Sequence, residues 1–186
     1  MKTIEKLFKQ VKTAYDQDHN PIDGVAGVVA TCIDKLNESN KRLQSKANSK
    51  EYWVFYEGTN ISRPYLPEML FLDKQIFSLA WTSMIKSINP EKGLIGMDIE
   101  SVNKIIYTGI MSFALIYDLW KPTSRKTPGT FFEVILGSIM SAMLPGHTKT
   151  KHIILPGQAE NVSTDIVFQP KEGVSQKLCK PPWLMV

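Results

Sequence analysis

The segment GTFFEVILGSIMSAMLPG, residues 129–146, has the length and composition of a buried helix, yet it contains one carboxylate, Glu133. Pro145 and Gly146 end the apolar run, as expected after a helix. Burying an unpaired charge is strongly unfavourable. The sequence around Glu133 therefore predicts either a side chain that reaches the helix surface or a carboxylate with a positively charged partner.

The composition is that of an ordinary globular protein. Of 186 residues, 43% are hydrophobic and 22% are charged, which argues against disordered and fibrous classes. The length suits one substantial domain, or a helical lobe joined to a compact αβ lobe. A net charge of +4 slightly favours a polyanionic partner.

The N-terminal segment and the cysteines bear on the cellular compartment. Lysines and glutamates interrupt every apolar run in the first 17 residues, unlike a signal peptide, and no uninterrupted apolar run is long enough to cross a membrane. Cys32 and Cys179 lie far apart without metal-ligand spacing, so we expect buried thiols in a reducing environment. The sequence predicts a cytoplasmic protein with no membrane partner.

Residues 1–120 are predicted to form a mostly helical lobe. Apolar spacing predicts a first helix over residues 3–17, and the other expected helices are 22–47, 69–88 and 98–120. Asp98 or Ser101 would cap the last of these. Between the second and third helices, EYWVFYEG is typical of a strand, and ISRPYLPEM is expected to be a loop.

Residues 121–186 are predicted to form an αβ core. The basic loop KPTSRKTPGT precedes the helix that contains Glu133, and two β-branched runs, KHIILP and VSTDIVF, follow it. The last segment, VSQKLCKPPWLMV, would supply one more strand. This order predicts an α+β fold in which a helical lobe precedes a short sheet.

A second carboxylate, Asp165, lies in the middle of VSTDIVF, where strand alternation places it on the opposite side from Ile166. Aspartate is disfavoured in strands, so an edge or solvent-facing position is one interpretation. The other is that Asp165 and Glu133 converge on one divalent cation. Mg²⁺ prefers oxygen ligands, and its charge would compensate for two partly buried acids.

The order RKTPGTFFE, HIILP and NVSTDIVF resembles the PD-(D/E)XK nuclease fold of type II restriction endonucleases. The resemblance covers about residues 120–186 and implies a partial restriction-endonuclease-like core with a short mixed sheet. It implies that Glu133 is the glutamate of the first core helix and that Asp165 is the metal-binding aspartate. The implied activity is Mg²⁺-dependent hydrolysis of phosphodiester bonds in double-stranded DNA.

The end of the chain departs from the family signature, which has an acidic or variant residue, a spacer and a lysine on the strand after the aspartate. Lys180, preceded by LC, is our first choice for the lysine at the scissile phosphate, and Lys177, preceded by SQ, is the second. Pro181 and Pro182 would interrupt sheet pairing. We expect a C-terminally shortened copy; an inactive copy and a variant completed by a partner chain stay open.

Three basic residues precede the helix of Glu133: Lys121, Arg125 and Lys126. They are predicted to contact DNA phosphates, although a solvated loop would have the same composition. A homodimer is expected, because palindromic DNA sites mirror a twofold axis in the protein.

Two other classes of function stay open from the sequence. A non-catalytic DNA-binding or subunit-interaction module would bind DNA in a salt-sensitive manner without requiring metal. A helical regulatory protein would bind another protein through apolar surfaces and would not bind DNA. Only the nuclease hypothesis requires Asp165 and a divalent cation together.

Overall fold

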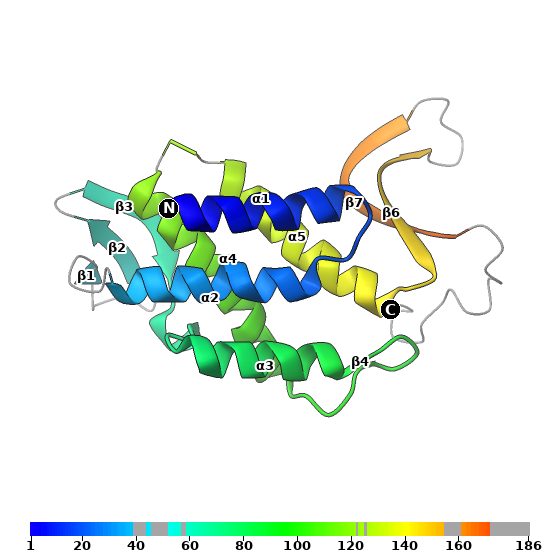
Figure 1. The fold of residues 1–186 in the computed structure, drawn as a ribbon, viewed down its shortest axis with the longest axis horizontal. Coiled ribbons are helices and arrows are strands. Elements are labelled where there is room, and N and C mark those ends of the chain that lie inside the picture. Colours follow the sequence, from blue (N-terminus) through cyan, green and yellow to red (C-terminus); the bar gives the residue numbers. More distant parts are fainter. Residues whose placement is uncertain are drawn as a thin grey trace.

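A computed structural model describes residues 1–38, 44–45, 52–56, 59–121, 123–124, 126–154 and 161–171 of the chain. Within these ranges the backbone alone is described for residues 44–45, 52–56, 59–64, 151–154 and 161–165. The described residues form a helical body with a small sheet at each end (Figure 1).

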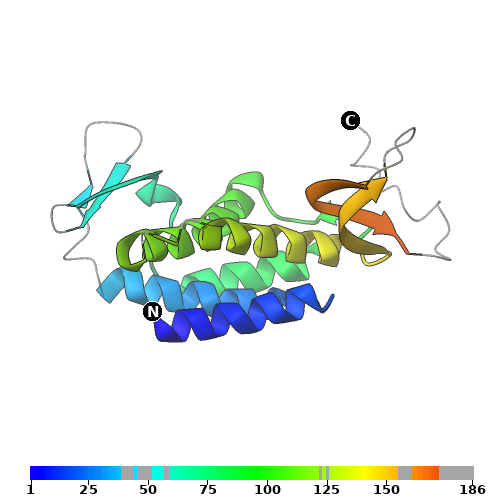
Figure 2. The ribbon, with the colours of Figure 1, turned by 90° about the horizontal axis from the view of Figure 1, so that it is seen from above.

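Five helices build the body. Three lie side by side, with α2 between α1 and α3, and α4 and α5 pack behind them (Figures 1 and 2). The helices are α1 (Lys2–Asp16), α2 (Ile22–Glu38), α3 (Lys74–Lys86), α4 (Ile99–Trp120) and α5 (Lys126–Met143).

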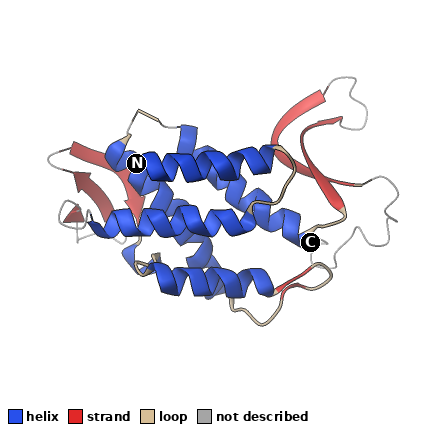
Figure 3. Ribbon diagram, in the orientation of Figure 1, coloured by secondary structure: helices blue, strands red, loops and turns tan. Residues whose placement is uncertain are grey.

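The strands lie mainly at the two ends of the body, and all pairings among the described residues are antiparallel (Figure 3). One end carries β1 (Gln44–Ser45), β2 (Tyr52–Tyr56) and β3 (Thr59–Tyr65), followed by the 3-10 turn η2 (Pro67–Met69). The other end carries the hairpin of β6 (His147–Ile154) and β7 (Asn161–Pro170). A short hairpin of β4 (Ile88–Asn89) and β5 (Gly93–Leu94) follows α3.

The first and fourth helices confirm the predictions made from periodicity. On α1 the buried residues are Ile4, Phe8, Val11 and Tyr15, which recur at helical spacing. Asp98 caps α4, because its carboxylate accepts hydrogen bonds from the backbone N–H of Ser101 at 2.8 Å and from the Ser101 hydroxyl at 2.6 Å.

Three phenylalanines join α1, α4 and α5 at the centre of the core. The ring centroid of Phe113 lies 5.1 Å from that of Phe8 and 4.1 Å from that of Phe131, and Phe8 meets Phe131 edge-on at 5.5 Å. All three are at least nine-tenths buried. Such aromatic pairs are stabilising beyond the area they bury, so this cluster holds the three helices in a defined packing.

Helix α4 has the length and apolar composition of a helix that could cross a membrane, and half of its most apolar window is buried inside the structure. The central helix of a soluble core meets the same criteria. Here α4 packs against α2, α3 and α5 as the central helix of the body.

Three predicted boundaries in the helical part were wrong. The second helix ends at Glu38 instead of residue 47, because Gln44 and Ser45 pair with β2 as strand β1. The expected loop ISRPYLPEM belongs in part to strand β3, which tolerates Pro64 next to an irregularity in the β2–β3 register. The third helix begins at Lys74, where the Asp73 side chain accepts hydrogen bonds from the backbone N–H groups of Gln75 and Ile76.

Helix α5 begins earlier than the basic loop suggested. Its first residue is Lys126, so Pro128 lies in its first turn. Backbone N–H groups in the first turn have no intrahelical acceptor, so proline, which lacks this group, costs no hydrogen bond there. The strands predicted after α5 are confirmed as β6 and β7. The third strand of the predicted mixed sheet would fall in residues 172–186, outside the described residues.

Helix α1 approaches α5 closely at Gly137. A Cβ atom built on Gly137 would lie 2.0 Å from the Tyr15 hydroxyl oxygen and 2.7 Å from Cζ. Tyr15 is 3% exposed, and the ammonium of Lys149 lies 4.0 Å from the centroid of its ring. Only glycine permits this contact.

Gly137→Ala is therefore expected to destabilise the protein by about 1–2 kcal/mol, since overpacking outweighs the higher helix propensity of alanine. Gly129→Ala on the same helix is the matched control, because a Cβ there has no neighbour within 4 Å. The control is expected to raise stability by up to about 1 kcal/mol. Urea unfolding of both variants checks this, and equal effects of the two substitutions would contradict the close approach.

Candidate functional site

Glu133 lies on α5 at the border of the apolar face. The residue is partly exposed, whereas its neighbours Phe131, Val134 and Ile135 are buried. Gly137 and Ser141 follow it at intervals of four residues, so the three positions share one side of the helix. Glu133 is thus placed at the edge of the core instead of in its apolar interior.

This side of α5 faces the end of α1. Burial raises the pKa of the Tyr15 hydroxyl above its usual value, and the nearby carboxylate of Glu133 raises it further. Tyr15 is therefore neutral at physiological pH. The structure places Glu133 close enough to the end of α1 for the two groups to interact electrostatically.

Asp165 lies on β7 at an irregularity of the hairpin. Thr150 pairs with Val167 and His152 pairs with Ser163, so residues 164–166 of β7 lie opposite residue 151 of β6. The side chain of Ile166 packs against the helical core, and both strands contact α5. The strand that carries Asp165 therefore adjoins the helix that carries Glu133.

Helix α5 and strand β7 lie next to each other, but only part of the predicted metal site falls within the described residues. The Asp165 side chain, Lys177 and Lys180 lie outside the described parts, so the shared metal ion stays a prediction. Among the side chains that are described, no three His, Cys, Asp or Glu residues gather as metal ligands.

The predicted DNA-contacting residues differ in their surroundings. Lys121 is exposed and forms an ion pair with Glu5 of α1. Lys126 is exposed and begins α5, about 10 Å along the helix from Glu133 at about 1.5 Å per residue. Arg125 lies outside the described residues. Phosphate binding by all three stays a prediction.

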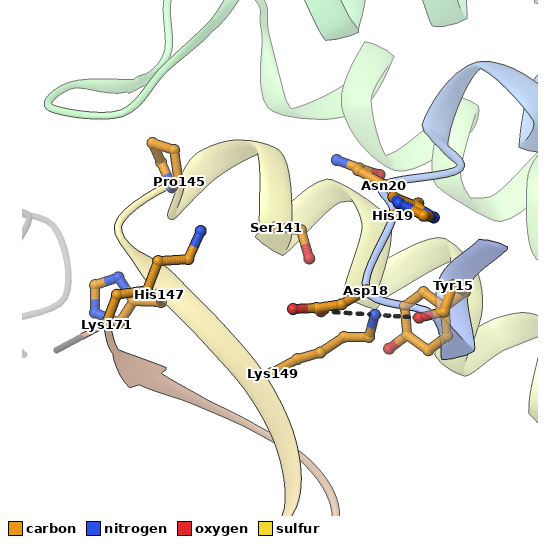
Figure 4. A pocket seen from close by; sticks show the side chains of 9 residues that line it. All are labelled: Tyr15, Asp18, His19, Asn20, Ser141, Pro145, His147, Lys149 and Lys171. Atoms are coloured by element: carbon orange, nitrogen blue, oxygen red, sulfur yellow. Dashed lines mark hydrogen bonds and ion pairs between the residues drawn. The ribbon is translucent and has the colours of Figure 1, made fainter.

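A polar pocket that the sequence did not reveal lies where the α1–α2 turn meets α5 and the base of the β6–β7 hairpin (Figure 4). Its volume is about 150 Å³. The turn contributes Tyr15, Asp18 and His19, and the base of the hairpin contributes His147, Lys149 and Lys171.

The local sequence explains the turn. Asp18 adopts φ of 60°, a left-handed conformation that aspartate tolerates better than most residues, and this reverses the chain after α1. The Asn20 side chain accepts a hydrogen bond from the N–H of Ile22 at 3.2 Å. The same side chain donates to the carbonyl of Ser138 at 3.1 Å, which attaches the turn to α5.

Lys149 attaches the hairpin to the same turn. Its ammonium donates to the Tyr15 carbonyl, lies 3.1 Å from the Asp18 carboxylate and lies over the Tyr15 ring (Figure 4). The side chain is only 14% exposed. Nothing in the local sequence around Lys149 indicated that its side chain reaches a residue 131 positions away.

The thiol of Cys32 does not contribute to this pocket. Cys32 is fully buried on α2, as expected from the sequence, and burial raises the pKa of its thiol. A buried thiol with a raised pKa is unreactive at neutral pH. Cys179 lies outside the described residues.

Comparison with known proteins gave one informative match. No protein-family profile and no curated protein sequence matches the chain. Among solved structures, the crystal structure of the type IIP restriction endonuclease Kpn2I superposes with a TM-score of 0.64 at 26% sequence identity. The match covers 82% of this chain and 52% of Kpn2I, so the chain spans about half the length of that enzyme. Across most of its residues, the protein therefore has a fold that resembles a type II restriction endonuclease.

Proposed function

We propose that the protein is a type II restriction endonuclease-like hydrolase that cleaves phosphodiester bonds in double-stranded DNA with Mg²⁺. The observation that carries this proposal is the likeness to Kpn2I over 82% of the chain, at a TM-score of 0.64 and 26% sequence identity. The substrate, the metal and a homodimeric assembly belong to the proposal, because the match covers only part of that enzyme.

The arrangement of α5 and β7 supports the proposal. Glu133 lies at the edge of the core on α5, and this helix contacts both strands of the hairpin that carries Asp165. Carboxylate oxygens at these positions are ligands of the kind that Mg²⁺ prefers. The bound ion would supply charge for the transferring phosphate and activate water. Glu133 and Asp165 would hold it, and Lys180 would contact the scissile phosphate.

The partial exposure of Glu133 also fits the proposal. A metal ligand must be reachable by a DNA phosphate, whereas a carboxylate sealed inside the core would not be. The electrostatic interaction with Tyr15 shows that the surroundings of Glu133 contain a large neutral side chain at one side.

The first test is cleavage of a mixed library of DNA duplexes. We expect cleavage with Mg²⁺, none after chelation by EDTA, and recovery on readdition of Mg²⁺. Asp165→Asn and Glu133→Gln are each expected to lower the rate at least about 100-fold, because each removes a charged metal ligand. Glu91→Gln is the control, since Glu91 is exposed in the β4–β5 turn.

Unchanged cleavage by both variants would contradict the assigned ligands. If the folded protein binds duplex DNA without cleaving any member of the library, the catalytic proposal fails and the non-catalytic DNA-binding module is favoured. Circular dichroism of each variant establishes that lost activity does not reflect unfolding.

The second test concerns the basic residues before α5. Lys126→Ala and Arg125→Ala are each expected to weaken DNA binding. Each should also reduce the magnitude of the slope of log K against log salt concentration by about 0.9, the effect of one lost phosphate contact. Lys121→Ala should change the slope less, because Glu5 already neutralises that ammonium. Fluorescence anisotropy in EDTA over a range of salt measures this, and an unchanged slope for Lys126→Ala would exclude its predicted role.

A further inference from the structure

The pocket between the α1–α2 turn and the base of the β6–β7 hairpin has the features of an oxyanion site. We propose that it binds a backbone phosphate of duplex DNA, at a position separate from the carboxylates that would hold the metal. The proposal rests on the proposed function, because it takes DNA as the source of the phosphate. It adds Lys171 and His147 as residues that position the duplex.

Charge in the pocket favours an anion. Lys149 and Asp18 neutralise each other at 3.1 Å, so the formal charge that is left among the lining residues belongs to Lys171. The backbone N–H of Lys171 donates to the carbonyl of Gly146 at 2.8 Å, which fixes the residue at the base of the hairpin. Its side chain extends from there toward the end of α5 (Figure 4).

Two residues that line the pocket each have a buried polar atom without a hydrogen-bond partner among the described residues: the hydroxyl of Tyr15, which lies against Gly137 of α5, and Nδ1 of His147. Tyr15 is only 3% exposed. Buried polar groups are nearly always paired, and leaving one unpaired is unfavourable. A phosphate oxygen accepts hydrogen bonds from hydroxyl and imidazole N–H donors alike.

The rigidity of the walls suits a positioning site. Asn20 attaches the turn to α5, and Lys149 attaches the turn to the hairpin, so three separate parts of the chain hold the pocket open in one arrangement. The volume of about 150 Å³ is sufficient for several water molecules or one phosphate group. An ordinary solvated surface cluster would show neither these attachments nor buried unpaired donors.

The pocket also lies within reach of a duplex at Glu133. Ser141 lines it and follows Glu133 by eight residues on α5, about 12 Å at about 1.5 Å per residue. One strand of duplex DNA presents a phosphate about every 3.4 Å of axis, so this distance corresponds to only a few phosphates. A phosphate held in the pocket would therefore fix which phosphate reaches Glu133.

Two measurements test the proposal on the full chain. Titration with inorganic phosphate, followed by NMR of the imidazole groups, should shift the His147 signals to saturation. The three histidines allow assignment by single His→Asn variants. Lys171→Ala should abolish saturation. Anisotropy with duplex DNA in EDTA should show the salt slope of log K lowered by about 0.9 in Lys171→Ala.

Lys86→Ala is the matched control, because Lys86 is exposed on α3 and α2 separates that helix from α1. It should leave phosphate binding unchanged. Lys171 is exposed, so its substitution should leave thermal unfolding unchanged, and His147→Gln provides a second variant that should weaken phosphate binding by at least about fivefold.

The outcomes separate this proposal from the proposed function. If the wild-type protein binds and cleaves duplex DNA but Lys171→Ala binds it with the same slope, the pocket proposal alone is overturned. Phosphate saturation with an unchanged DNA slope also overturns it, because the pocket would then serve a free anion. Absence of any DNA binding by the wild-type protein overturns both.

Discussion

The contact among Phe8, Phe113 and Phe131 is the constraint on which the rest of the structure depends. It joins α1, α4 and α5 through ring centroids 4.1–5.5 Å apart. Phe131 is buried two residues before Glu133, so the packing that holds the ring also sets which side of α5 carries the carboxylate. The packing of the apolar core therefore determines where the Glu133 carboxylate lies.

The same helix connects both functional regions. At Gly137, the absence of a side chain lets Tyr15 lie directly on α5, and this brings the end of α1 to the border shared by Glu133 and Ser141. The helix contacts both strands of the hairpin that carries Asp165, and Ser141 lines the pocket that we propose for phosphate. In the proposed enzyme, metal binding and DNA positioning would thus be coupled through one rigid helix instead of through mobile loops.

Much of the helical fold could be predicted because amphipathic periodicity is local. The α1 pattern and the Asp98 cap both follow from residues within a few positions of one another. The end of α2 and strand β3 were wrong because strand pairing overrode helix propensity in one case and proline punctuation in the other. The resemblance to restriction endonucleases was confirmed at the level of fold, whereas the roles of Glu133, Asp165 and Lys180 stay predictions.

The sequence by itself determined the five helices and strands β2, β6 and β7, and it marked Glu133 and Asp165 as carboxylates in segments that disfavour them. Only the tertiary structure decided that Glu133 lies at the edge of the core, and only it brought Lys149 to Asp18. The physical reason is that a misplaced charge is visible against its immediate neighbours, whereas a pocket depends on contacts between residues more than a hundred positions apart. Those contacts are set by how whole helices pack, which no local pattern encodes.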